Sequence, residues 1–177
     1  MNAPEFIKFP KMARLSREII ITEKLDGTNA QVYVGEDGQV LAASRTRWIT
    51  PSDDNFGFAL WVSQHEEELR MLGPGRHYGE WWGCGIQRGY GLSERRFSLF
   101  NVSRWGAVRP ECCHVVPELF RGMFDSQSVR NVMEVLAGNG SAAAPGYKNP
   151  EGIIVYHVAG NVAFKKTLQD DEKGKPE

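Results

Sequence analysis

The chain has few cysteines and no long apolar run, and each absence excludes a class of protein. Its cysteines number three, with Cys112 and Cys113 adjacent, which is not the pattern of a disulfide framework. We therefore expect a reducing environment and a cytoplasmic protein. No apolar stretch approaches the ~20 residues of a membrane helix, and charges are spread through residues 1–17. We expect no membrane span and no secretory leader.

The chain also lacks an excess of either charge. It has 21 basic and 22 acidic residues, so its composition gives no evidence for a nucleic-acid partner. Clustered arginines can still make a local basic surface on a neutral protein. Five arginines are candidates for such a basic surface, which would grip nucleic acid: Arg88, Arg95, Arg96, Arg104 and Arg109. An equally good interpretation is that they are scattered, solvated side chains.

Zinc-ligand spacing is absent as well. Cys84, Cys112, Cys113 and His114 contain no C-x2-C pair or similar spacing, which zinc sites normally have. We interpret the cysteines as small apolar residues packed in strands.

The periodicity of apolar residues predicts more strands than helices. A chain of 177 residues, 41% of them apolar, can bury a core without disulfides. Alternation predicts strands on both sides of a turn within residues 18–34, with others at 40–44, 78–83, 96–102, 113–116, 153–158 and 162–164. Helical spacing predicts helices over 52–71, capped by Ser52–Asp54, and over 126–136. Residues 6–10 look extended, and residues 35–38 form a hairpin loop. The sequence predicts an α+β fold of mostly antiparallel sheets with flanking helices.

The segment Glu23-Lys24-Leu25-Asp26-Gly27-Thr28-Asn29 lies between two apolar strands. A lysine fixed where a strand turns can act as a nucleophile once it loses its proton. Burial or nearby cations must lower its pKa from the usual ~10.4 for this to happen. A solvated lysine fits poorly beside the apolar run Ile19-Ile20-Ile21.

The K-x-D-G pattern at Lys24 resembles the nucleotidyl-acceptor lysine of the covalent nucleotidyltransferases, which comprise DNA ligases, RNA ligases and mRNA capping enzymes. Alone it is a weak signal. It is followed, in order, by Ser44-Arg45-Thr46-Arg47, Tyr78-Gly79-Glu80-Trp81, Phe97-Ser98-Leu99-Phe100, Glu151-Gly152-Ile153-Ile154-Val155 and Ala163-Phe164-Lys165-Lys166. This series is most similar to the RNA ligase family. The resemblance implies a nucleotidyltransferase (ligase adenylation domain) fold over residues 1–168, followed by a charged, frayed tail over 169–177.

The resemblance also implies how the base is bound. Glu23 would accept from the exocyclic amine of adenine, which favours ATP over GTP because guanine presents a carbonyl at that edge. Phe100 would stack on the adenine, with Phe97 as the alternative or as a core residue. Asp26 would cap the turn through its carboxylate, and Gly27 would let the phosphate approach closely.

Other matched positions would bind phosphates, ribose and metal. Lys165 would contact the α-phosphate, Arg45 the ribose or phosphates, and Asn29 would support the nucleic-acid end, while the role of Arg47 is not separable from that of Arg45. Glu80 would contact the ribose hydroxyl and metal-bound water, and Glu151 would organise Mg2+ (or Mn2+), a cation that takes few protein ligands. By alternation, Thr167 faces the site with Lys165, and Lys166 points away.

The sequence therefore predicts an ATP-dependent polynucleotide ligase, foremost an RNA ligase, acting through a lysyl-AMP intermediate at Lys24. Its substrates would be RNA (or DNA) ends, gripped by its own surface or with a partner protein, since little chain follows Lys165. DNA-ligase-like nick sealing remains an alternative. So does a capping-type guanylyltransferase, which Glu23 disfavours. A nucleotide-binding module without catalysis is disfavoured by the intact site residues.

Overall fold

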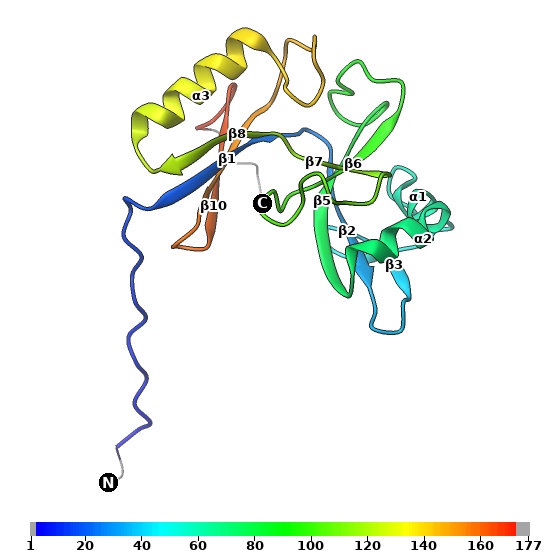
Figure 1. The fold of residues 1–177 in the computed structure, drawn as a ribbon, viewed down its shortest axis with the longest axis horizontal. Helices are drawn as coiled ribbons and strands as arrows, with labels where there is room; N and C mark the ends of the chain where they lie inside the picture. The colour runs from blue at the N-terminus through cyan, green and yellow to red at the C-terminus, as the bar shows by residue number, and fades with distance from the viewer. Residues whose placement is uncertain (1–2, 173–177) are drawn as a thin grey trace.

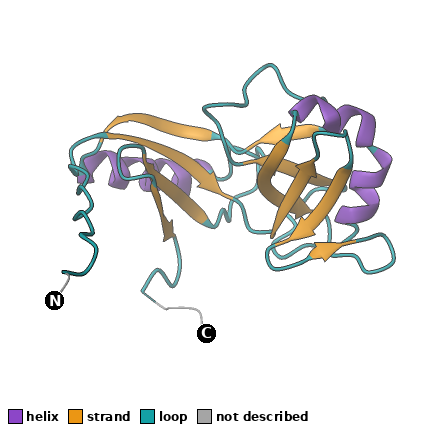
Figure 2. Cartoon of the chain, turned by 90° about the horizontal axis from the view of Figure 1, so that it is seen from below, coloured by secondary structure: helices purple, strands orange, loops and turns teal. Residues whose placement is uncertain are grey.

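Two β-sheets form the core of the protein, whose computed structural model describes residues 3–172. Their strands run in the orders β4-β3-β2-β5-β6-β7 and β10-β9-β1-β8. Within the described residues the ladder between β6 and β7 is parallel, and the other ladders between named strands are antiparallel. The predicted α+β class is confirmed. Figures 1 and 2 show the sheets side by side, each with its helices on one face.

The six-stranded sheet has short helices on one face. Its strands are β2 (Thr28–Val34), β3 (Val40–Ser44), β4 (Trp48–Ile49), β5 (Gly75–Gly83), β6 (Arg95–Leu99) and β7 (Cys113–Val115). Helices α1 (Phe58–Gln64) and α2 (Glu66–Leu69) and the 3-10 turn η1 (Arg70–Leu72) supply Phe58, Val62 and Leu69 to the core beneath them. That core includes Val32, Trp81 and other residues that alternate along the strands.

The four-stranded sheet is covered by one longer helix. Its strands are β1 (Glu18–Lys24), β8 (Glu118–Met123), β9 (Gly152–His157) and β10 (Val162–Thr167). Helix α3 (Ser126–Asn139) begins where Asp125 accepts from the N–H of Ser128, and it packs Met133 and Leu136 over Ile21 and Ile153. Helix α3 lies above this sheet in Figure 1.

The first predicted helix begins later than its pattern indicated. Residues 52–57 form turns, and α1 begins after Gly57 with no side chain on its N-cap. Asp54 nevertheless binds the helix terminus, because its carboxylate accepts from the N–H groups of Ala59 and Leu60. The expected helix start at residue 52 is therefore wrong, whereas Asp54 of the predicted cap segment does bind the free N–H groups of the helix.

Other predictions fail in the segments between the strongly alternating strands. Strand β8 was not predicted, because its residues are half-buried or exposed and show no clean alternation. The strand expected over 96–102 ends at Leu99. In the tail expected to fray, the carboxylate of Asp171 accepts from Lys166 and from the N–H of Thr167. Residues 173–177 of that tail lie outside the described residues.

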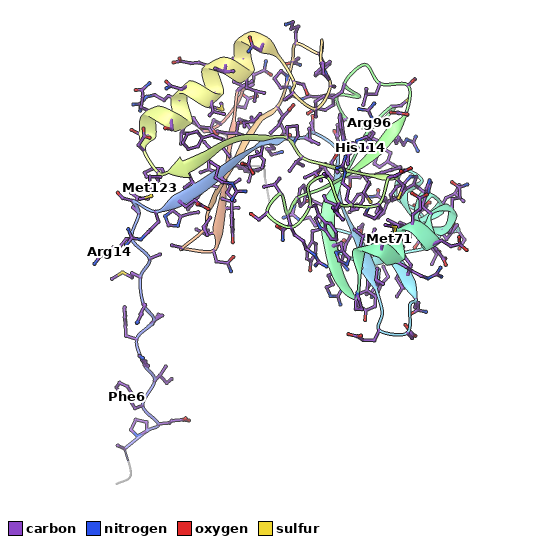
Figure 3. The ribbon with its side chains drawn as sticks, viewed as in Figure 1. Phe6, Arg14, Met71, Arg96, His114 and Met123 are labelled. Atoms are coloured by element: carbon purple, nitrogen blue, oxygen red, sulfur yellow. The ribbon has the colours of Figure 1, made fainter. Side chains whose placement is uncertain are left out.

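Residues 3–17, the described part of the N-terminal segment, carry no regular secondary structure. This segment is extended at residues 6–10, as expected, and exposes the side chains of Phe6 and Phe9. Phe6 and Arg14 lie on this arm, away from both sheets (Figure 3). None of the described helices is long and apolar enough to span a membrane.

Candidate active site

Lys24 lies where the two sheets join. Strand β1 belongs to the four-stranded sheet, and after the link Leu25–Gly27 the chain enters the other sheet as β2. Lys24 is the last residue of β1 and pairs with Gly152 of β9. Its ammonium nitrogen lies 2.6 Å from Oε2 of Glu151, and the two side chains are 22% and 13% exposed. The nucleophile predicted from the sequence is thus held by a predicted metal-binding carboxylate.

Glu80 is the second carboxylate at this junction. It lies on β5 opposite Asn29 of β2, and its Oε2 accepts from the Asn29 amide at 3.1 Å. Its Oε1 accepts from the N–H of Gly27, also at 3.1 Å. Burial raises the pKa of Glu80 to about 7, although the nearby Lys24 ammonium opposes this shift. Glu80 therefore links the turn after Lys24 to the centre of the six-stranded sheet.

Asp26 binds an arginine that the sequence did not single out for the site. The Asp26 carboxylate accepts from Nε of Arg88 at 2.8 Å and does not cap its own turn, contrary to expectation. Nη1 of Arg88 donates to the carbonyls of Asn149 at 3.0 Å and Pro150 at 3.4 Å, just before Glu151. Arg88 thus ties the turn after Lys24 to the loop that carries Glu151.

Gly27 is required by the neighbouring strand. A β-carbon here would overlap the Trp81 carbonyl oxygen and lie 2.7 Å from Cβ of Trp82. The backbone of the turn can pack against β5 because Gly27 has no side chain. This packing against protein is a structural reason for the glycine, in addition to the phosphate approach expected from the sequence.

Glu23 is buried on the opposite side of β1 from Lys24, with 1% of its surface exposed. Its Oε2 accepts from the backbone N–H groups of Ala142 and Ala143 at 2.8 and 2.9 Å. These residues lie in the loop that follows α3. Oε1 of Glu23 is buried and has no hydrogen-bond partner, so a polar acceptor is available beside this loop.

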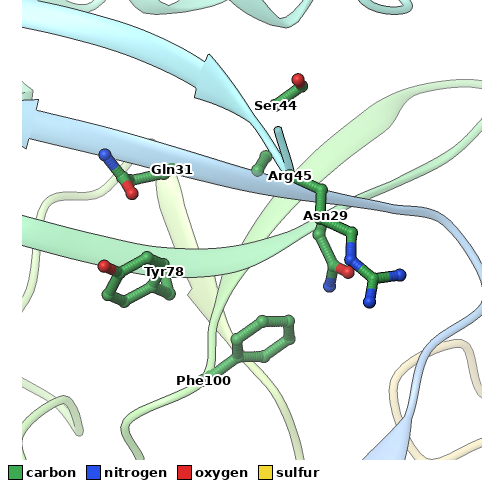
Figure 4. A pocket seen from close by; sticks show the side chains of 7 residues that line it. Asn29, Gln31, Ser44, Arg45, Tyr78 and Phe100 are labelled. Carbon is green, nitrogen blue, oxygen red and sulfur yellow. The ribbon is translucent and has the colours of Figure 1, made fainter. Parts of the chain in front are cut away.

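A pocket of about 300 Å³ lies on the face of the six-stranded sheet opposite α1. Its lining side chains include two predicted nucleotide ligands, Arg45 and Phe100, together with Asn29 (Figure 4). Phe100 is 41% exposed, whereas Phe97 is fully buried in the core. Between these two phenylalanines, Phe100 is the one placed to meet a ligand.

The pocket also separates two neighbouring arginines. Arg45 lines it and makes no ion pair within residues 3–172. The guanidinium of Arg47 lies 2.5 Å from the carboxylate of Asp53 and makes a second bond to it at 3.0 Å. Arg45 is thus available to a ligand, while Arg47 holds the loop after β4.

Lys165 is exposed on β10, the outer strand of the four-stranded sheet. The register places Thr167 level with Gly152 and Lys24, so Lys165, two residues earlier, shares the sheet face of Lys24. Lys166 lies on the other face and pairs with Asp171 at 2.8 Å. The alternation expected at Lys165, Lys166 and Thr167 is what the register shows.

A family model for RNA ligases matches residues 17–168. The chain belongs to the RNA ligase family. No match was found among curated proteins.

Solved structures of a Naegleria gruberi RNA ligase share the fold of this RNA ligase family member. A mutant without ligand and a mutant with AMP and Mn each align with a TM-score of 0.60 and 19% identity, over 93% of this chain and 57% of theirs. A mutant with ATP and Mn aligns with a TM-score of 0.63 and 18% identity, over 94% and 58%. The chain thus spans somewhat more than half the length of these proteins.

The carboxylates of this RNA ligase family member fit a magnesium ion. Glu80 lies within the electrostatic influence of both Lys24 and Glu151. Within residues 3–172, no three His, Cys, Asp or Glu side chains gather as a metal cluster. Magnesium commonly takes one or two carboxylates and completes its shell with water and phosphate oxygens. The donor set suits that cation better than one requiring a full protein cage.

The five arginines considered as a nucleic-acid grip bind other groups of the protein. Each binds a backbone carbonyl or a carboxylate: Arg88 as described, Arg95 the carbonyls of Cys84 and Phe56, Arg96 the carboxylate of Glu94, Arg104 the carbonyl of Leu72, and Arg109 that of Cys113. They fix loops to strands. The structure therefore favours separate structural roles over one shared basic surface.

Proposed function

We propose that this chain is an ATP-dependent RNA ligase whose nucleophile is Lys24. The neutral Lys24 amine attacks the α-phosphorus of ATP, a nitrogen–phosphorus bond forms, and the bond to pyrophosphate breaks. AMP then passes from the lysine to the 5′-phosphate of an RNA strand. A 3′-hydroxyl finally displaces AMP, forming the phosphodiester bond. The observation that carries the proposal is the 2.6 Å contact between Lys24 and Glu151 at the junction of the sheets.

Glu151 would accept the proton that Lys24 must lose. Its Oε2 is within the reach required of a general base, and the pair is largely shielded from water. Bound Mg2+ would neutralise the charge on the triphosphate, and Glu80 and Glu151 would hold it there. Arg45 and Lys165 would add positive charge near the phosphates, since neither is engaged by a described carboxylate.

The unsatisfied oxygen of Glu23 supports adenine as the base. A buried acceptor without a donor costs free energy, and the exocyclic amine of adenine would supply a donor. Guanine would present a carbonyl there and leave two acceptors facing each other. Phe100, half-exposed in the pocket, would stack on the base.

Family membership favours RNA ends over DNA nicks as the substrate. The free thiols of Cys84, Cys112 and Cys113 support a cytoplasmic location. A partner protein would supply additional grip if the chain's own surface does not suffice.

Labelling with nucleotide separates the candidate functions. The protein is incubated with Mg2+ and ATP or GTP labelled at the α-phosphate, and covalent label is followed on wild type, Lys24→Ala and Lys166→Ala. The last is a matched control, because Lys166 lies on the opposite face of the sheet and pairs with Asp171. We expect label from ATP in wild type and Lys166→Ala and none in Lys24→Ala. Label from GTP would indicate a capping enzyme. Nucleotide binding without label would indicate a module without catalysis.

A further inference from the structure

One face of the six-stranded sheet has no helix over it. Helices α1 and α2 cover the face that carries Val32 and Trp81. On the other face the register places Gln31 beside Tyr78, and Tyr33 beside Arg76. Trp48 of β4 completes the set, because it pairs with Ala43, which itself pairs with Gln31. These residues, Gln31, Tyr33, Trp48, Arg76 and Tyr78, are called the open face below.

The open face exposes aromatic rings in a fixed arrangement. Trp48 is 48% exposed and Tyr78 is 55% exposed. The rings of Tyr33 and Trp48 meet edge to face at 5.9 Å, and the Arg76 guanidinium lies 5.3 Å from both centroids. These contacts hold the rings and the arginine in place before any ligand arrives.

The charge of the open face is positive. Arg76 makes no ion pair within residues 3–172. On strands β2 to β5, the carboxylate on this face is that of Glu80, buried at the end next to Lys24. A free guanidinium beside exposed rings suits an anionic chain of bases better than an aliphatic protein segment.

The open face is continuous with the candidate nucleotide pocket. Gln31 and Tyr78 line that pocket together with Phe100 and Arg45 (Figure 4). The N–H of Phe100 donates to the carbonyl of Tyr78 at 3.0 Å, so the two aromatic residues are fixed to each other. A strand whose end lies in the pocket would therefore meet Tyr78 first and Trp48 next.

We infer that the open face binds the single-stranded RNA adjoining the end that is joined. Bases stack on Tyr78 and Trp48, and Arg76 contacts the backbone phosphate between them. The inference rests on the proposed function for its choice of RNA. It adds a binding surface that extends beyond the nucleotide pocket through Tyr33, Trp48 and Arg76, none of which lines that pocket.

Tryptophan fluorescence can report this contact directly. Of the five tryptophans, Trp81, Trp82 and Trp105 are buried and Trp61 packs against the core, so Trp48 is the exposed one. A short single-stranded RNA with a 5′-hydroxyl, which cannot be sealed, is titrated into wild type, Trp48→Ala, Arg76→Gln and Leu60→Ala. The last is a matched control, since Leu60 is 49% exposed on α1, behind the sheet.

We expect the RNA to quench Trp48 fluorescence in wild type and in Leu60→Ala. Anisotropy of labelled RNA should show roughly tenfold weaker binding to Trp48→Ala. Arg76→Gln, which keeps Trp48, should lower the slope of log affinity against log salt by about one. Unchanged affinity in both variants, equal quenching by blunt duplex RNA, or tighter binding of single-stranded DNA would overturn the inference.

Lysine adenylylation measured on the same preparations keeps the two proposals apart. Normal labelling by ATP, together with RNA binding that does not depend on Trp48 or Arg76, would overturn only the inference that the open face binds RNA. Absence of labelling, together with RNA binding that depends on Trp48, would overturn only the proposed ligase activity.

Discussion

Nζ of Lys24 lies 2.6 Å from Oε2 of Glu151, although 127 positions separate the two residues in the chain. The contact exists because β9 pairs with β1 and ends level with Lys24. The four-stranded sheet thereby brings the proposed nucleophile to its proposed proton acceptor. Several expected outcomes depend on this junction and on the residues that hold it.

Replacing Glu151 by Gln should slow the formation of lysyl-AMP strongly. The amide keeps the size of the side chain, but it neither accepts the Lys24 proton nor carries charge toward a metal. Loss of a general base typically costs 10²–10⁴-fold in rate, so we expect a drop of at least about 100-fold in single-turnover labelling. Glu134→Gln, at an exposed position of α3, is the control and should label normally. A Glu151→Gln rate close to that of wild type would mean that another group takes the proton.

Removing Arg88 should loosen both segments that it joins. Arg88→Ala loses the Asp26 ion pair and the bonds to two carbonyls, which leaves a partly buried carboxylate unpaired. We expect a loss of about 1–3 kcal/mol in the free energy of unfolding, together with slower labelling. Arg88→Lys should not restore either property, since a lysine cannot span three acceptors in a fixed fork.

Urea unfolding and single-turnover labelling would measure both effects of Arg88. Arg130→Ala is the control. It removes an exposed guanidinium that bonds to Gln127, and it should change neither the unfolding free energy nor the labelling rate. Full activity in Arg88→Ala would show that the loop carrying Glu151 is positioned without the bonds of Arg88 to Asn149 and Pro150.

The stability of the protein should depend on pH through Glu80. Its pKa is raised from 4.5 to about 7 on folding, so between these values the folded protein holds a proton that the unfolded chain has released. The contribution of Glu80 to stability therefore falls as pH rises through this window, by up to about 3 kcal/mol. Glu80→Gln lacks this penalty and should gain stability relative to wild type as pH rises.

Paired denaturation curves of wild type and Glu80→Gln would test this, at about pH 5 and at about pH 8. The difference in unfolding free energy should move in favour of the variant at the higher pH. A difference that is the same at both values would show that Glu80 does not titrate in this range.

Replacing Gly27 by Ala should destabilise the protein by about 1–3 kcal/mol, because the new methyl group overlaps the Trp81 carbonyl and Trp82. Gly138→Ala is the matched control. That glycine lies in α3 with open space around it, so alanine there should stabilise the helix by roughly 0.5–1 kcal/mol. Thermal melts of both variants would check the signs, and an unchanged melt of Gly27→Ala would contradict the close packing.

Local sequence pattern accounts for most of the strands and for the choice of the candidate site residues. The hairpin at 35–38 and the strands around it follow from alternation and turn chemistry, which act between neighbouring residues. Lys24, Arg45, Glu80, Glu151 and Lys165 were identifiable because each stands in a short motif. The exposed, irregular β8 carried no such pattern, and its pairing with β1 supplies its order.

By itself, the sequence determined the α+β class, the order of the motifs and the family to which they point. The tertiary structure decided which member of each similar pair faces the site. It placed Phe100 in the pocket and Phe97 in the core. Among the described residues, it left Arg45 without an ion pair while Arg47 pairs with Asp53. It also brought Arg88, a loop residue, into contact with Asp26. These outcomes depend on contacts between residues far apart in the chain. Periodicity within one segment specifies the face of a strand, but sheet pairing specifies what that face meets.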